Sequence, residues 1–147
     1  MSALELETFL HGKIPLSHAM GVRVAEISRE RLVLEAPLAA NINHLGTAFG
    51  GSLHALPTLA CYAAVWTMMN EAGVEGHVVV KRSEASYRQP VKGPLRAVCV
   101  RPPLDLATRF LDDLRRHKKA RLALTATVEG TTGKAAVEFS GVFVAIG

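Results

Sequence analysis

Aromatic residues, cysteines and long apolar runs are all scarce in this sequence of 147 residues. Phe, Trp and Tyr together make up 5% of the chain, so we expect a core built from Leu, Val and Ala. No apolar run reaches the length that a membrane-spanning helix needs. The first residues, MSALELETFL, carry two acids before any basic residue, unlike a secretory signal. These absences predict a cytoplasmic protein with no membrane partner.

Motifs of several catalytic and metal-binding classes are also missing. The two cysteines, Cys61 and Cys99, lie among apolar residues and form no C-x-x-C pair, so we interpret them as core thiols. The six histidines show neither an H-x-x-x-H pair nor a Cys/His spacing typical of zinc. The chain has no G-x-S-x-G nucleophile motif and no phosphate-binding loop. We therefore predict no metal ion.

The charge balance is only moderately basic. Charged residues account for 20% of the chain, with a formal net charge of +4. This excess suits a polyanionic ligand, but the basic residues are not interleaved with aromatic residues as they are on a surface that stacks bases. We predict no nucleic-acid partner.

The apolar pattern predicts one domain of mixed α+β class over residues 1–147. Strands are expected at 22–27, 31–36, 77–89, 95–101, 119–129 and 136–146, and short helical pieces at 3–10 and 14–20. An amphipathic helix is expected at 102–118, with an apolar face formed by Leu104, Ala107, Leu111 and Leu114. A longer helix at 52–70 is apolar on nearly all sides, which is typical of a buried helix. A curved antiparallel sheet wrapped around this long helix fits the order of elements.

Pro57 lies inside the long apolar helix. Proline removes one backbone hydrogen bond and its ring clashes with the carbonyl of Leu53. The helix is therefore expected either to start late or to bend at this position.

The loop before the long helix carries the candidate chemistry. Gly50 and Gly51 leave backbone N–H groups unshielded at the helix start, where they and the helix dipole can stabilise an oxyanion. Asn43 offers an amide that could orient a water molecule or a substrate, and Asn41 in the same loop is an alternative to it. Thr58 follows Gly51 by two helical turns, so its hydroxyl could face the same way. The glycine pair could instead only allow the helix to pack closely on the sheet.

The stretch N-x-x-G-T-x-F-G-G-S-L, from Asn43 to Leu53, resembles the thioesterase-like domain at the C-terminus of YiiD-type bacterial proteins, a variant of the PaaI-like hot-dog thioesterases. Residues 83–91, SEASYRQPV, are similar to the third strand of that family and the turn after it. The resemblance covers nearly the whole chain and implies the hot-dog fold. It also implies a homodimer whose two sheets join, with the active site at the subunit interface, and leaves a dimer of dimers open.

The resemblance implies roles for individual residues. Asn43 and Gly51 match the loop Asn and the oxyanion donor of the PaaI-like enzymes. The chain departs from the pattern at Phe49, where many of these enzymes have His, and at Thr58, where they have a helical Asp. Thr58 cannot serve as a carboxylate base, although it could position a water molecule. Apart from the resemblance, Glu84 on the next strand is a candidate base and substrate-binding residue, with a solvated strand carboxylate as the competing interpretation. His54, one turn beyond Gly50, could also face the pocket, with a plain helix histidine as the competing interpretation.

The expected activity is hydrolysis of an acyl thioester of coenzyme A or an acyl carrier protein by direct attack of water. We expect the acyl chain to lie near Phe49, Gly50, Leu53 and Leu56. Coenzyme A would be part of the substrate, with no separate cofactor. Its phosphates could meet basic residues of the long strand and its turn, which are Lys81, Arg82, Arg88 and Lys92. These residues could equally be ordinary exposed strand charges.

Two other functions are weighed against hydrolysis. The missing helical carboxylate favours a non-catalytic module that binds acyl-coenzyme A or a lipid. A hot-dog dehydratase or hydratase would need a His and carboxylate motif that the sequence does not show. YiiD-type proteins can also carry an acetyltransferase domain, which this sequence lacks, so we expect no acetyltransferase activity.

Overall fold

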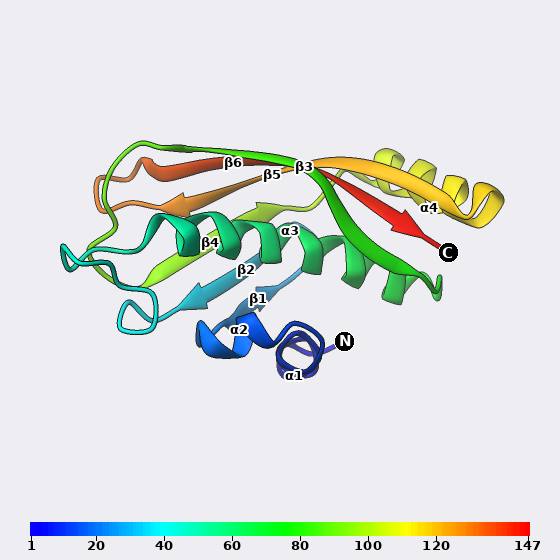
Figure 1. Ribbon diagram of the computed structural model, residues 1–147. Coiled ribbons are helices and arrows are strands. Elements are labelled where there is room, and N and C mark those ends of the chain that lie inside the picture. The colour runs from blue at the N-terminus through cyan, green and yellow to red at the C-terminus, as the bar shows by residue number, and fades with distance from the viewer.

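Six antiparallel strands form one curved sheet that arches over a single long helix in the computed structural model, which describes residues 1–147 (Figure 1). The order of strands across the sheet is β1-β2-β4-β5-β6-β3. The strands are β1 (Arg23–Ile27), β2 (Arg31–Ala36), β3 (His77–Tyr87), β4 (Leu95–Val100), β5 (Lys119–Glu129) and β6 (Ala135–Ile146). The helices are α1 (Ala3–Lys13), α2 (Pro15–Ala19), α3 (Gly50–Glu71) and α4 (Leu104–His117). The predicted α+β class and order of elements are confirmed.

The core lies between α3 and the concave face of the sheet, which we call the inner face. One cluster of 36 buried residues joins α3 to β2, β4, β5 and β6, and its members are mainly Leu, Val and Ala. Strand β5 shows why the sequence pattern works, since its residues alternate strictly between exposed and buried. Leu122, Leu124, Ala126 and Val128 point inward.

Helix α3 starts early and runs through Pro57, so the expectation of a late start is wrong. The helix begins at Gly50, seven residues before the proline, and Pro57 itself is buried. An interior proline costs about 3 kcal/mol. Burial of the surrounding side chains, among them Leu53, Leu56 and Leu59, offsets that cost. Despite this apolar character, neither α3 nor any other helix has the combination of length and hydropathy required to cross a membrane.

Helix α4 differs from its prediction in its first turn. Leu104 was expected on the apolar face but is 82% exposed. The helix begins at Leu104, and its buried residues, Phe110 and Leu114, lie in its second and third turns. The apolar stripe therefore starts one turn after the helix does, with Ala107 as its first partly buried member.

The β1 edge of the sheet is closed by α1. The Glu7 carboxylate accepts a hydrogen bond from the Val24 N–H at 2.9 Å, and His11 Nε2 donates to the Val22 carbonyl at 2.7 Å. Side chains of α1 therefore satisfy backbone groups that an edge strand otherwise offers to another chain.

The β3 edge is open. Val79 and Val80 are 48% and 45% exposed, and the side chains on both faces of the strand are mostly exposed or half-buried. β3 is the last strand of the sheet, and no helix or strand of the chain pairs with its free edge. The two edges of the sheet thus differ, because α1 packs along the β1 edge and no element covers the β3 edge.

A β-bulge between Val80 and Arg82 decides which β3 side chains face α3. Ser83 lies opposite Gly141, within the inner-face register of β6, whereas Arg82 lies opposite Val142 on the outer face. Beyond the bulge the inner face of β3 carries Ser83, Ala85 and Tyr87, and the outer face carries Arg82, Glu84 and Ser86.

Replacing Gly76, the residue before β3, is expected to destabilise the protein. It has a φ of +157°, and a Cβ there would lie 2.7 Å from the Ile146 carbonyl oxygen. We expect Gly76→Ala to lower the free energy of unfolding by about 1–3 kcal/mol in urea denaturation. Gly12→Ala is the matched control, because Gly12 lies inside α1 with open space around it, and it should raise stability by up to about 1 kcal/mol. Equal effects of the two substitutions would contradict the assignment.

Candidate active site

The first turn of α3 presents three backbone N–H groups that have no acceptor within the chain. Phe49 is the N-cap residue and makes no side-chain capping bond. The first helical hydrogen bond runs from the Leu53 N–H to the Phe49 carbonyl at 3.0 Å. The N–H groups of Gly50, Gly51 and Ser52 precede it and are left unbonded. With the positive end of the helix dipole, they form a site suited to an anion or an oxyanion.

A side chain at Gly51 would meet the ring of Phe49 rather than the sheet. A Cβ at Gly51 would lie 2.4 Å from Cε2 of the Phe49 ring, and all three of its closest contacts are atoms of that ring. A Cβ at Gly50 would meet nothing within 4 Å. The alternative that the glycine pair only lets the helix pack on the sheet therefore has no support in the geometry.

Asn43 is bonded on all sides within its own loop. Its Oδ1 accepts from the backbone N–H groups of Leu45 and Thr47 at 2.9 and 3.1 Å. Its Nδ2 donates to Thr47 Oγ1 at 2.9 Å and to the Ala48 carbonyl at 3.3 Å. The amide thus shapes the loop that leads into α3, and no donor or acceptor of it is left for water or substrate.

Asn41 is distinguished from Asn43 by burial. It is 3% exposed, and its Nδ2 donates to the carbonyls of Met20 and Pro37 at 2.9 and 2.8 Å. Its backbone carbonyl accepts from the Phe49 N–H at 2.7 Å. Asn41 therefore anchors the loop to the body of the protein.

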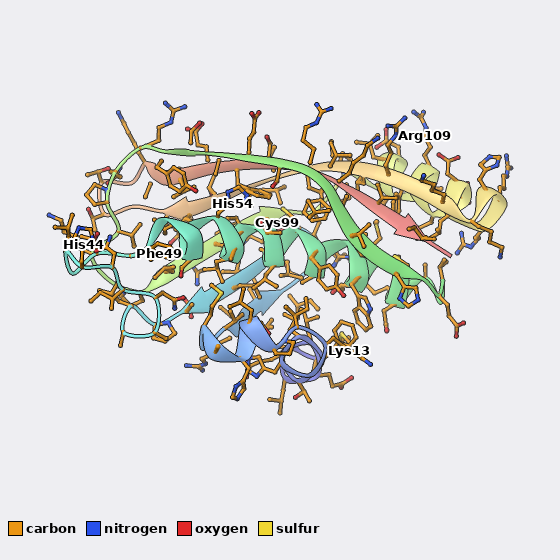
Figure 2. The ribbon with its side chains drawn as sticks, viewed as in Figure 1. Lys13, His44, Phe49, His54, Cys99 and Arg109 are labelled. Atoms are coloured by element: carbon orange, nitrogen blue, oxygen red, sulfur yellow. The ribbon has the colours of Figure 1, made fainter.

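Thr58 and His54 share one face of α3 with Gly51. On a helix of 3.6 residues per turn the three positions fall within about 60° of one another. The Thr58 hydroxyl donates to the His54 carbonyl at 2.8 Å, which leaves only its lone pairs for another partner. His54 Nε2 lies 3.0 Å from the Ser83 hydroxyl, and its ring meets Phe139 edge-on with centroids 5.4 Å apart. Figure 2 labels Phe49 and His44 at the end of the molecule where α3 begins, with His54 further along the helix.

The other predicted substrate-binding residues do not gather at this helix start within one chain. Arg82 and Glu84 point to the outer face of β3, away from α3. Arg88, just beyond the strand, forms an ion pair with Glu138 at 3.4 Å. Leu53 is 5% exposed and belongs to the core, as does Leu56.

The exposed apolar surface at the helix start comes instead from the loop. Phe49 is 56% exposed, and Ile42 and Leu45 are 50% and 74% exposed. Tyr87, which sequence reasoning missed, reaches this end of α3 from the inner face of β3, where its hydroxyl donates to the Gly50 carbonyl at 3.4 Å. Sequence reasoning also missed Ser83 as an inward-facing residue. Both residues were missed because the β-bulge after Val80 sets which β3 side chains face inward, and the bulge cannot be seen in the sequence.

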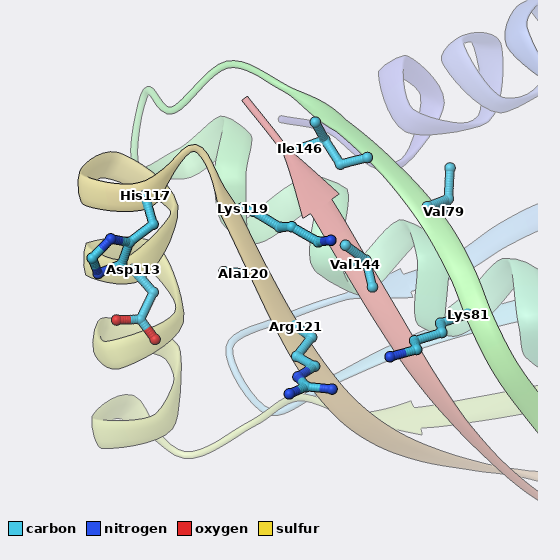
Figure 3. A pocket seen from close by; sticks show the side chains of 9 residues that line it. All are labelled: Val79, Lys81, Asp113, His117, Lys119, Ala120, Arg121, Val144 and Ile146. Carbon is cyan, nitrogen blue, oxygen red and sulfur yellow. The ribbon is translucent and has the colours of Figure 1, made fainter.

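A large groove lies elsewhere, on the outer face of the sheet beside α4 (Figure 3). It is an open groove of about 1010 Å³ whose polar side chains are Lys81, Lys119, Arg121, His117 and Asp113. The sheet separates this groove from α3, so it is not part of the candidate active site.

No group of side chains in the structure is arranged to hold a metal ion. Cys61 and Cys99 are free and buried. The neighbouring Cys99 thiol and burial both raise the pKa of Cys61, so this thiol stays protonated and is a core residue rather than a nucleophile.

A curved antiparallel sheet wrapped around one long helix defines the hot-dog fold, and the predicted hot-dog fold is confirmed. A family model described as "Putative thioesterase (yiiD_Cterm)" matches residues 3–147, and the chain belongs to this family.

Three solved structures show the extent of the similarity. A protein of unknown function from Chlorobaculum tepidum is 31% identical, with a TM-score of 0.93 over 98% of this chain and 93% of that one. A "putative thioesterase from Shewanella oneidensis" is 28% identical, with a TM-score of 0.89 over 99% and 97% of the two chains. A thioesterase from Haemophilus influenzae is 13% identical and shares the fold, with a TM-score of 0.75 over 99% and 91%.

Replacing Asn43 tests its role in the loop. We expect Asn43→Ala to lower the free energy of unfolding by about 1–2 kcal/mol and to speed amide hydrogen exchange at Leu45 and Thr47, whose N–H groups lose their acceptor. Asn43→Asp keeps both acceptor bonds and should retain the protection of these amides. Unchanged exchange in Asn43→Ala, together with lost turnover, would show that Asn43 acts on the substrate instead.

Proposed function

We propose that this protein hydrolyses acyl thioesters carried by coenzyme A or by an acyl carrier protein. The observation that carries the proposal is the set of unbonded N–H groups at Gly50, Gly51 and Ser52. They lie in the fold and the family of the thioesterases, beside the exposed apolar surface of Phe49, Ile42 and Leu45. This surface offers a place for the first part of an acyl chain.

In the proposed reaction the Gly51 N–H donates to the thioester carbonyl oxygen. Water attacks the carbonyl carbon, and the negative charge that develops on oxygen is stabilised by the N–H group and the helix dipole. The carbon–sulfur bond then breaks and releases a thiol and a carboxylic acid. Asn43 contributes by holding the loop, and the lone pairs of Thr58 Oγ1 can accept a hydrogen bond from the water.

Coenzyme A enters as part of the substrate, and no separate cofactor is needed. Arg82 takes part in no ion pair within the chain and remains available for a phosphate group, as does Lys81 beside it. Arg88 is already engaged by Glu138.

A second candidate is a module that binds acyl thioesters without hydrolysing them. It is favoured by one observation, namely that the inner face around the start of α3 carries no carboxylate. Glu84 faces outward, and Thr58 donates its proton to the helix itself. In that case the same N–H groups would bind the carbonyl and no turnover would follow.

Removing a single N–H group tests the oxyanion site. Gly51→Pro deletes the donor at a position where the first helical turn tolerates proline, while Gly51→Ala keeps it. Both substitutions place a Cβ against the Phe49 ring, so they differ mainly in the donor. We expect kcat for thiol release from a panel of short, medium, long and aromatic acyl-coenzyme A substrates to be about 10²–10³-fold lower in Gly51→Pro than in Gly51→Ala.

The panel also separates the two candidate functions. Tight binding of an acyl-coenzyme A to the wild type with no thiol release above background, and none from an acyl carrier protein, would favour the binding module. Equal kcat values for the two Gly51 variants in an active hydrolase would show that the oxyanion lies elsewhere.

We also propose that the open β3 edges of two copies pair to form a homodimer. Free backbone groups and two half-exposed valines on β3 support this, since the β1 edge is closed by α1. In light scattering we expect the wild type at twice the mass of one chain and Val80→Glu at the mass of one chain, with unchanged circular dichroism. Val100→Glu is the control, because Val100 is 64% exposed on β4, away from this edge. A monomeric wild type would contradict the proposal.

A further inference from the structure

Hydrolysis by direct attack of water needs a group that removes a proton from the water, and the chain lacks the helical carboxylate that would do so. This inference rests on the proposed hydrolysis. We infer that His54 is the general base and that Ser83 is the residue that positions its ring.

The helix brings His54 to the oxyanion donors. His54 follows Gly51 by three residues, a spacing that puts the two positions about 5–6 Å apart on one face of a helix. Long side chains on a helix lean back toward its N-terminus, over the residues three and four positions earlier. For His54 these residues are Gly51 and Gly50, which have no side chains to block the approach.

The tertiary structure restrains the imidazole. Nε2 lies 3.0 Å from the Ser83 hydroxyl, and the ring packs edge-on against Phe139 of β6. His54 and Ser83 are both half-buried, so the pair is neither sealed in the core nor free in solvent. If Nε2 donates its proton to Ser83 Oγ, the lone pair of the ring lies on Nδ1, where it can accept a proton from water.

The charged groups around His54 do not compete for this role. The elements packed against it are α3, β3 and β6. Beyond the bulge, β3 places one titratable side chain on the inner face, that of Tyr87, four residues from Ser83. Helix α3 places Tyr62 on the face that carries His54. The charged side chains of these strands, Lys81, Arg82, Glu84 and Glu138, line the outer face.

The step balances without a co-reactant. Water gives a proton to Nδ1 of His54 as its oxygen bonds to the thioester carbon, and the carbonyl electron pair moves to the oxygen held by Gly51. When the oxyanion collapses, the carbon–sulfur bond breaks and the thiolate takes the proton from the imidazolium. The products are a carboxylic acid and a thiol, and His54 returns to its neutral form.

The test combines kinetics with a reading of the resting tautomer. We expect His54→Gln to lower kcat by about 10²–10⁴-fold with little change in KM, because a glutamine can still donate to Ser83 but cannot accept the proton. The fall in wild-type rate on acidification, where the imidazole is protonated, should be absent from the residual rate of this variant. Ser83→Ala should lower kcat less, and Ser83→Thr should restore it. His117→Gln, an exposed histidine at the end of α4, is the matched control and should keep the wild-type rate.

Nitrogen chemical shifts of the imidazole give a measurement that does not depend on activity. In the resting protein we expect the Nε2–H tautomer of His54, and a shift toward the other tautomer in Ser83→Ala. A resting Nδ1–H tautomer would overturn the assignment. So would an active wild type whose His54→Gln variant keeps its rate within about threefold, which would leave the hydrolase itself standing. A wild type that hydrolyses no thioester would overturn the hydrolase and the base together.

Discussion

The need to enclose α3 governs the rest of this structure. Its buried residues are spread around the helix rather than along one stripe, so no single packed surface can cover them. Each fully buried leucine contributes about 1.5–3 kcal/mol. Leu53, Leu56 and Leu59 are buried on one side of the helix, and Val65 and Met69 are buried on another. The sheet has to curve around such a helix, and α1 completes the enclosure by stacking Phe9 on Trp66 with ring centroids 4.0 Å apart.

Enclosure is incomplete along one stripe of α3, and this is where the candidate chemistry lies. Ala55, Thr58 and Tyr62 are only half-buried, and they follow Gly51 at helical spacing. Burial of Tyr62 is nevertheless enough to raise the pKa of its phenol. The open β3 edge borders the same side of α3, since Ser83 and Tyr87 both reach it from that strand. A second copy paired at β3 would therefore complete the cover over the stripe and the site together.

The sequence predicts those features of the fold that depend on strong local periodicity. Strand β5 is buried on one face and exposed on the other, so its alternation survives in the printed residues. Strand β3 lies at an edge and both its faces are largely exposed, so its apolar and polar residues alternate only weakly. The bulge after Val80 then reverses which residues of the alternation face inward. That is why Arg82 and Glu84 were expected near the substrate and lie on the outer face. The prediction that Leu104 lies on the apolar face of α4 is wrong for a related reason. Helical spacing shows which residues share a face, but it does not show at which turn that face meets the rest of the protein.

The features of the candidate site also divide into those that local sequence predicts and those that depend on the folded structure. The open donors of Gly50 and Gly51 follow from being at a helix start, which is a local property. The bonds that occupy Asn43 involve residues only two to five positions away, yet they depend on one side-chain rotamer that the sequence does not specify. The pairing of His54 with Ser83 spans 29 positions and exists only after β3 has folded onto α3. Sequence reasoning could name His54 but had no means to give it a partner.

The electrostatics of the inner face favour a neutral base over a carboxylate beside Gly51. A carboxylate base loses its charge when it takes the proton from water, so it would stand neutral beside the oxyanion and offer it no charge attraction. An imidazole starts neutral and becomes positive as the oxyanion forms, so the two charges arise together and attract. For unit charges about 4 Å apart at an effective dielectric constant of about 20, this attraction is about 4 kcal/mol. With Glu84 on the outer face and Thr58 neutral, no fixed charge opposes the pair, and a face of α3 without a carboxylate beside Gly51 fits a site of this kind.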